Sequence, residues 1–193
     1  GYRDFDDFLS RLQSKYRKAI RRERRCTEDL RVEVQLHPDQ RRIDALHRFY
    51  ASTCQNFGPW GRVYMNQLFF RYLAEHWGHR LLTVTAWRGE EPIAGTFNVL
   101  KGDTLYGRHW GCIEEVKFLH FELCYYKTIE YAIANNLQTF EPGQGGHHKL
   151  KRGFLPNITY SNHWLAHSGL HDALREHTAH ERQAVERQVE MIK

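Results

Sequence analysis

Residues 80–111 have the sequence RLLTVTAWRGEEPIAGTFNVLKGDTLYGRHWG, and this stretch decides the fold. It contains three runs of mainly apolar, β-branched and aromatic residues, at 80–88, 93–100 and 104–111. The short glycine-containing segments GEEP and KGD separate the runs and are typical of tight turns. Three strands joined by two tight turns predict an antiparallel meander.

The segments on either side of the meander alternate between helical and extended patterns. Apolar residues recur at three- and four-residue steps and predict helices at 4–26, 39–57, 65–76, 120–135 and 170–191. Shorter alternating runs predict further strands at 30–37, 137–141 and 158–166. This order predicts an α+β fold with a mixed sheet flanked by helices. Strand 137–141 is expected to run parallel to strand 104–111.

Length and composition favour one domain over residues 1–193, because domains typically hold roughly 100–200 residues. No segment approaches the ~20 consecutive apolar residues of a membrane span, so no span is expected. The cysteines show no metal-binding or redox spacing; they are Cys26, Cys54, Cys112 and Cys124. Reduced thiols are typical of a cytoplasmic protein, and the cytoplasm is the location that we expect.

The positive charge is concentrated in one segment. Lys15–Arg25 contains seven basic residues and one acid, whereas the whole chain has a net charge of only +5. This basic part of helix 4–26 could attract an anionic partner such as RNA, a phosphate or a lipid surface. A solvated helix face that pairs with acids on a part of the protein outside this sequence is the alternative, and the sequence favours neither.

Polar residues gather at the ends of the predicted elements between residues 105 and 154. Tyr106, Arg108 and Trp110 alternate along strand 104–111 and are expected on one face, with His109 on the other. Such a row could line a ligand-binding cleft. Cross-strand packing explains the aromatic residues equally well, but Arg108 must contact water or a carboxylate.

Two glutamates are candidate catalytic bases, because a carboxylate can accept a proton from a reacting group. Glu141 ends strand 137–141 and precedes a glycine-rich loop, where a purely structural carboxylate is equally compatible. Glu122 lies in the first turn of helix 120–135, where it could instead stabilise the helix N-terminus. Either glutamate could be the ion-pair partner of Arg108.

The loop after strand 137–141 carries the remaining candidates. His148 could transfer a proton or bind substrate. Lys149 and Arg152 lie three residues apart and could together hold a phosphate or carboxylate; a surface pair beside a turn is the alternative. No third ligand accompanies His147 and His148 at a useful spacing, so no metal site is expected.

The same residues carry a resemblance to a known family. Its motifs are Lys15–Arg25, Pro92–Gly95, Leu105–Gly111, Leu119–Tyr126, Ile129–Ile133, Phe140–Gly143, His148–Leu150 and Arg152–Pro156. In these motifs the chain resembles the second half of FemAB-like proteins of the GNAT acyltransferase superfamily, in particular the bacterial peptidoglycan biosynthesis/recognition group. The resemblance implies a GNAT-like fold, transfer of an acyl or aminoacyl group to an amine, and a missing N-terminal half of the protein.

The chain departs from the family pattern at two places. Superfamily members that bind acetyl-CoA carry a glycine motif between the fourth strand and the next helix, where backbone N–H groups hold the pyrophosphate. Residues 112–118 contain no glycine and two acids, so ordinary use of acetyl-CoA is not expected. His147 stands where an acid usually precedes the His-Lys pair. The donor stays unknown: an aminoacyl-tRNA bound through Lys15–Arg25 and a long acyl-CoA thioester are both compatible.

We therefore expect an acyl- or aminoacyltransferase that acts on a cell-envelope precursor of the peptidoglycan type. The expected catalytic residues are Glu141, Glu122 and His148, and the expected substrate-binding residues are Tyr106, Arg108, Trp110, Lys149 and Arg152. The rival is a non-catalytic GNAT-like module that recognises peptidoglycan fragments, RNA or a partner protein. The rival fits the absence of the acetyl-CoA glycine motif.

Overall fold

The computed structural model describes residues 1–56, 58, 61–144 and 146–192. The chain divides into two compact units, Gly1–Gly145 and Gly146–Lys193, each of which is considered by itself. The expectation of one domain over residues 1–193 stays a prediction. Within the described residues, no helix combines the length and the apolar character needed to cross a lipid bilayer.

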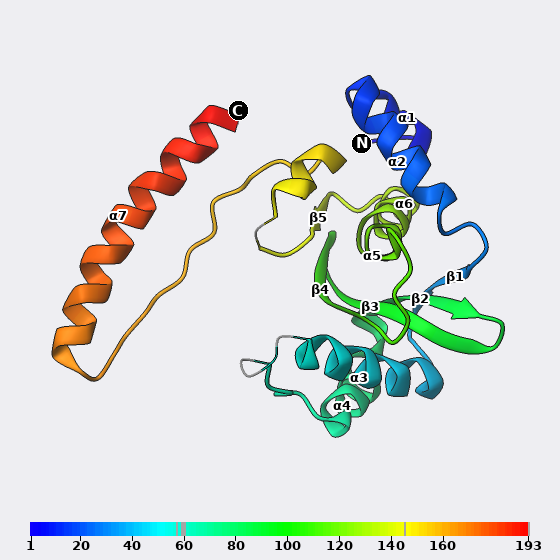
Figure 1. Cartoon of the computed structure of the whole chain (residues 1–193), viewed down its shortest axis with the longest axis horizontal. Coiled ribbons are helices and arrows are strands. Elements are labelled where there is room, and N and C mark those ends of the chain that lie inside the picture. Colours follow the sequence, from blue (N-terminus) through cyan, green and yellow to red (C-terminus); the bar gives the residue numbers. More distant parts are fainter. Residues whose placement is uncertain (57, 59–60, 145, 193) are drawn as a thin grey trace. The chain divides into compact units, whose positions relative to one another are not determined.

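The first unit is built on a five-stranded sheet with the order β1-β2-β3-β4-β5. Its strands are β1 (Arg31–Leu36), β2 (Leu81–Arg88), β3 (Glu91–Lys101), β4 (Thr104–Cys112) and β5 (Thr139–Glu141). Neighbours from β1 to β4 pair antiparallel, and β5 runs parallel to β4 (Figure 1). The α+β fold, the meander and the parallel last pair are therefore confirmed, and together they form the mixed sheet that was expected.

Helices cover both faces of this sheet (Figure 1). One face carries α3 (Gln40–Gln55) and α4 (Gln67–Trp77), which a 3₁₀ turn, η2 (Gly78–Arg80), connects to β2. The other face carries α5 (Leu119–Phe121), a π-helical turn, η3 (Glu122–Tyr126), and α6 (Lys127–Ala134). The first two helices, α1 (Phe5–Ser10) and α2 (Ser14–Arg25), lie on this second side, where α1 contacts α6.

The prediction of one continuous helix over 4–26 is wrong, because the chain breaks between α1 and α2 at Arg11–Gln13. The side chain of Arg17 explains how the break is accommodated. Its Nη1 donates to the carbonyl oxygens of Leu12 at 2.6 Å and Ser10 at 3.3 Å. Both carbonyl groups lie at the C-terminal end of α1, where the last carbonyl groups of a helix have no partner within it.

The other predicted helices of the first unit agree with the structure to within a few residues. The predicted helix 39–57 ends as α3 at Gln55, and Phe57 lies outside the described residues, as do Pro59 and Trp60. The predicted helix 120–135 corresponds to α5, η3 and α6. Its interruption by a π-helical turn was not predicted, because such turns leave no clear pattern in hydrophobic spacing.

Two apolar clusters attach the helices to the sheet. On the side of α3 and α4, Phe49, Phe70 and Phe97 are buried together, and the rings of Phe70 and Phe97 meet edge to face at 5.7 Å. On the side of α5 and α6, Leu119 and Leu123 pack against β2 and β3. Because both faces are covered, β2 is apolar or threonine along nearly its whole length rather than alternating with charged residues.

α3 approaches β4 so closely that only glycine fits at one position of the strand. A Cβ atom added to Gly111 would lie 2.0 Å from the carbonyl oxygen of Phe49 and 2.4 Å from its carbonyl carbon. Both are backbone atoms of α3, so no side-chain rotation could relieve the overlap. Gly111 therefore fixes the distance between α3 and the sheet.

The second unit contains a 3₁₀ helix, η4 (His147–Arg152), and one long helix, α7 (Ser168–Ile192). α7 confirms the predicted helix 170–191. The predicted strand 158–166 is wrong, because residues 154–165 have no regular secondary structure. A strand needs a hydrogen-bonded neighbour, and no other strand lies among the described residues of this unit. Tyr160 and Trp164 of this segment are 89% and 77% exposed.

We predict that Gly111→Ala destabilises the protein by at least about 2 kcal/mol, because α3 must move away from β4 to admit the methyl group. Gly78→Ala is the matched control: its Cβ atom meets only His37 Nδ1 at 3.6 Å. The control should be unchanged or up to about 1 kcal/mol more stable, since Gly78 has helical backbone angles. Urea unfolding monitored by circular dichroism measures both; equal midpoints for the two variants would contradict the prediction.

Candidate functional site

A β-bulge lies in the middle of the motif at 105–111. Phe97 of β3 pairs with His109, but the next residue, Asn98, pairs with Gly107, so Arg108 is the extra residue. A bulge reverses the alternation of side chains along its strand. Directly paired residues share a face of the sheet, so His109 lies on the face of Phe97, against Tyr50 and α3.

The predicted common face for Tyr106, Arg108 and Trp110 is therefore wrong. Tyr106 pairs with Val99, which packs on the α3 side, whereas Trp110 packs on the opposite side among the residues around α5. There the Trp110 ring meets His120 edge to face at 5.2 Å. Trp110 thus has a packing role, and the expected aromatic row along one face does not form.

Arg108, Tyr106 and Glu141 do come together. Arg108 Nη1 lies 3.2 Å from Glu141 Oε2, and its guanidinium carbon lies 5.0 Å from the centre of the Tyr106 ring. The other oxygen of Glu141, Oε1, accepts the backbone N–H of Gly143 at 2.7 Å. The predicted ion pair is present, although it is not buried, because the side chains of Arg108 and Glu141 are 43% and 38% exposed.

This ion pair lies at the point where β4 and β5 part. Parallel pairing covers only Thr104–Tyr106 and Thr139–Glu141, and β4 continues to Cys112 beyond it. Among the described residues, no strand pairs with that further part of β4 on the side of β5. We call this region, with Tyr106, Arg108, Glu141 and Gly143, the β4–β5 fork. It combines an accessible carboxylate with a strand edge on which an extended ligand could form hydrogen bonds.

Glu122 lies elsewhere, in the π-helical turn, and is only 3% exposed. Its Oε1 accepts a hydrogen bond from Arg24 Nη2 of α2 at 3.1 Å. Its Oε2 is buried and has no hydrogen-bond partner among the residues that the structure describes. Burial raises the pKa of the Glu122 carboxyl, and the positive charges of Arg24 and Lys127 oppose that rise only in part. Glu122 is thus an ion-pair partner of α2 and not of Arg108.

Arg24 joins two acids at this place. Its Nη1 also donates to Glu130 Oε1 at 2.7 Å, and Lys127 Nζ lies 3.1 Å from Glu130 Oε2. Sequence reasoning assigned Arg24 to the anion-binding segment and did not identify Glu130. The pairing of α2 with α6 joins residues about a hundred positions apart, so no local pattern could have revealed it.

Two hollows flank α2. The first, of ≈ 670 Å³, is the α1–α2 hollow; its lining residues are Phe5, Asp6, Leu9, Arg21, Arg24, Arg25, Thr27, Glu28, Leu30, Val32, Glu122, Lys127 and Glu130. The second, of ≈ 560 Å³, is the α2 groove; its lining residues are Lys15, Lys18, Ala19, Arg21, Arg22 and Arg25. The α1–α2 hollow carries both signs of charge, whereas the α2 groove carries only positive charge.

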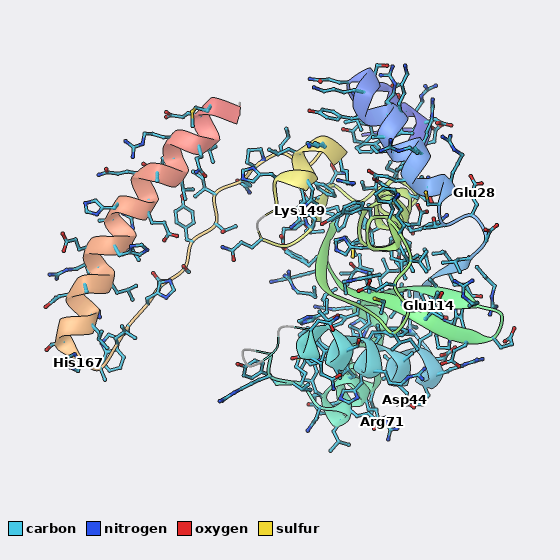
Figure 2. The ribbon with its side chains drawn as sticks, viewed as in Figure 1. Glu28, Asp44, Arg71, Glu114, Lys149 and His167 are labelled. Atoms are coloured by element: carbon cyan, nitrogen blue, oxygen red, sulfur yellow. The ribbon has the colours of Figure 1, made fainter. Side chains whose placement is uncertain are left out.

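The three remaining candidates belong to the second unit, in η4. Arg152 is buried, and its Nη1 donates to the backbone carbonyl of His148 at 2.9 Å, which stabilises the turn. Burial, together with the charges of Arg152 and Lys149, lowers the pKa of His148. Lys149 lies on the same short helix (Figure 2). The participation of these side chains in one site with Glu141 stays a prediction, and Gly145 of the intervening loop lies outside the described residues.

Residues 112–118 have acids in place of a phosphate-binding loop. Arg88 Nε donates to Glu114 Oε2 at 3.0 Å, and a second hydrogen bond joins the same two side chains. Glu114 is labelled in Figure 2. The acid expected to repel a pyrophosphate is therefore engaged in a surface ion pair. No group of three or more metal-binding side chains occurs among the described residues.

Comparison with known proteins places the chain in a family. A family model described as peptidoglycan biosynthesis/recognition, FemAB-like, matches residues 1–193. No curated protein matches the chain. Among solved structures, an aminoglycoside acetyltransferase from an uncultured soil metagenomic sample is 12% identical, with a TM-score of 0.49, and the match covers 71% of this chain and 99% of that chain.

A second aminoglycoside acetyltransferase from an uncultured soil metagenomic sample, in complex with sisomicin, is 10% identical. Its TM-score is 0.45, and the match covers 72% of this chain and 95% of that chain. At these identities and scores, the substrates of the two enzymes carry no weight for the present chain.

We predict that Glu122→Gln reduces the loss of stability as pH rises. The folded-state pKa of Glu122 lies above its ordinary value of 4.5, so its contribution to stability is complete below pH 4.5 and is lost as pH rises through the folded-state pKa. Gln keeps an acceptor for Arg24 and cannot ionise. Urea midpoints at about pH 4 and about pH 7 measure the effect, and an unchanged difference between the two midpoints would contradict it.

Arg24→Gln should act in the opposite direction, because it leaves Glu122 without its ion-pair partner and Glu130 with Lys127 alone. We expect a loss on the order of 2–4 kcal/mol at neutral pH, since the Arg24 side chain is only 23% exposed. The loss should be smaller in acid, where Glu122 is protonated. A loss of the same size at both pH values would show that packing, and not charge, explains the effect.

Proposed function

Because the chain belongs to the FemAB-like peptidoglycan biosynthesis/recognition family, we propose that it transfers an acyl or aminoacyl group to an amine of a peptidoglycan-type precursor in the cytoplasm. The observation that carries the proposal is the carboxylate of Glu141 at the β4–β5 fork. It is accessible, and its position is fixed by Arg108 on one oxygen and by the N–H of Gly143 on the other.

The proposed reaction uses Glu141 to accept the proton of the attacking amine. The amine nitrogen attacks the carbonyl carbon of the donor, and a new C–N bond forms while the proton passes to Glu141. The bond from that carbon to the oxygen of an ester or the sulfur of a thioester then breaks, and the leaving group takes up a proton. The open edge of β4 supports the proposal, because backbone N–H groups there could stabilise the oxyanion.

Two basic side chains are proposed to bind the substrate, one in each unit of the chain. Arg108 is held over Tyr106 and could bind a carboxylate or phosphate of the precursor at the same time as it contacts Glu141. Lys149 of the second unit is proposed to neutralise a further anionic group. These roles rest on side-chain chemistry and on the family's association with peptidoglycan.

We predict that Glu141→Gln lowers the rate of acyl transfer by about 10²–10⁴-fold, since it removes the proton acceptor. Lys149→Ala should raise KM more than it lowers kcat. The assay is transfer of a labelled acyl group from aminoacyl-tRNA or acyl-CoA to a peptidoglycan precursor. Glu114→Gln is the matched control, because Glu114 is likewise a surface glutamate paired with one arginine, and its rate should stay within about twofold.

The outcome separates the proposal from its rival, a non-catalytic recognition module. If the wild-type chain transfers acyl groups and Glu141→Gln transfers them equally fast, Glu141 is not the base. If the wild-type chain binds peptidoglycan fragments tightly and transfers nothing from either donor, the chain is a recognition module. In that case Arg108→Gln should still weaken binding of the fragments.

The α2 groove favours RNA as a second partner and aminoacyl-tRNA as the donor. Among the described residues, no acid pairs with Lys15, Lys18, Arg22 or Arg25, and no acid lines the groove. A phosphate backbone is a suitable ligand for such a surface. Arg24 is excluded from this surface, because it is paired with Glu122 and Glu130.

We predict that tRNA binds the chain and that its affinity falls by roughly 10²-fold between about 50 and 200 mM salt, as expected for about four phosphate contacts. Replacing Lys15, Lys18 and Arg22 together with glutamine should weaken binding and flatten the salt dependence. Fluorescence anisotropy with labelled tRNA measures both quantities. Binding that does not depend on salt, or that survives the triple replacement, would rule out the α2 groove as an RNA site.

A further inference from the structure

The α1–α2 hollow is separate from both proposed sites. No residue of the β4–β5 fork lines it, and it shares only Arg21 and Arg25 with the α2 groove. Its volume of ≈ 670 Å³ falls within the range of about 300–1,000 Å³ that is usual for small-molecule sites. Four apolar side chains give it a hydrophobic lining, and they are Phe5, Leu9, Leu30 and Val32.

The polar lining of the hollow is balanced in charge. Four acids and four basic residues contribute, and these are Asp6, Glu28, Glu122 and Glu130 with Arg21, Arg24, Arg25 and Lys127. Several of these groups already neutralise one another: Arg24 pairs with two glutamates, Lys127 with Glu130, and Arg21 with Asp6. A polyanion or a polycation would therefore meet repulsion from half of the lining.

Groups of both signs stay available to a ligand. Oε2 of the buried Glu122 has no hydrogen-bond partner among the described residues and can accept one from an ammonium group. Arg25 is exposed and forms no ion pair within the described part of the chain, so it can hold a carboxylate. Glu28, on the connection from α2 to β1, is exposed as well (Figure 2).

We propose that the α1–α2 hollow binds a small zwitterion, namely an amino acid or a short peptide, whose ammonium group contacts Glu122 and whose carboxylate contacts Arg25. The apolar lining would accept the side chain of the ligand. A metal ion fits less well, because the described residues offer no group of three metal-binding side chains. The inference does not rest on the proposed transfer reaction, since it concerns binding alone.

The ligand would supply a second hydrogen-bond partner to Glu122, whose Oε2 has none among the described residues. Arg24 forms ion pairs with both Glu122 and Glu130, whereas Lys127 forms its ion pair with Glu130. An ammonium group beside Oε2 would give Glu122 a cation of its own. Binding should therefore draw α2 and the π-helical turn together, because the ligand contacts residues of both.

Calorimetric titration of the full chain tests the proposal with trialanine as the probe, alongside N-acetyl-trialanine, trialanine amide and L-alanine. We expect trialanine to bind with a dissociation constant below about 1 mM and each blocked peptide to bind at least about tenfold more weakly. If L-alanine binds as tightly as trialanine, the ligand is a free amino acid; if only trialanine binds, the ligand is a peptide. Failure of both zwitterions to bind would overturn the proposal, as would equal binding of the blocked forms.

Variants locate the site. Arg25→Gln and Glu122→Gln should each weaken binding of the zwitterion by at least about tenfold. Arg22→Gln is the matched control for Arg25, because Arg22 lies on the same helix and lines only the α2 groove; its affinity should stay within about twofold. Arg25 is exposed, so its replacement tests the site even if Glu122→Gln fails to fold. Unchanged affinity for Arg25→Gln would overturn the proposal.

Discussion

The extra residue in β4 determines how this sheet presents its side chains. Up to Tyr106, β4 pairs with β5; from His109 onward, its alternation is reversed by the bulge at Arg108. The bulge places His109 against the core of α3 and leaves Arg108 half exposed beside the end of β5. It therefore creates the ion pair with Glu141, which in turn orients the turn at Gly143. A strand of regular alternation would have placed Arg108 and Trp110 on the same face.

Most of the fold could be predicted from the sequence because its cues are local. Glycine turns, apolar periodicity and strand alternation located all five strands of the sheet, the order of the meander and the parallel pair. The pairing of β1 with β2 was not predicted. The break at Arg11–Gln13 was missed, because its stabilisation depends on one arginine that reaches back to carbonyl groups of the preceding turn. The false strand at 158–166 had strand-like composition but no neighbouring strand in its unit.

The candidate site was only partly predictable, for a different reason. An ion pair of Arg108 with Glu122 or Glu141 followed from the need of a strand arginine for a carboxylate, and the structure shows the pair with Glu141. The role of Glu122 did not follow, because its partner Arg24 lies in a segment whose composition suggests an exposed basic surface. Arg24 of that segment is half-buried against Glu122 and Glu130. The basic side chains of the segment that stay exposed include Lys15, Lys18, Arg22 and Arg25. The segment thus combines an anchor with a cationic surface.

Glu122 and Glu141 show why a shifted pKa is not sufficient to assign a base. Burial raises the pKa of Glu122, which by itself is typical of a catalytic carboxyl. A base must also lie where the donor and the amine meet, and Glu122 lies outside the β4–β5 fork, in the π-helical turn, where it is bound to Arg24. Glu141 lies at an open strand edge, where an amine can approach and where Arg108 and Gly143 hold the carboxylate in one orientation. Access and orientation therefore support the proposal that Glu141 is the base, while Glu122 is an ion-pair partner of Arg24.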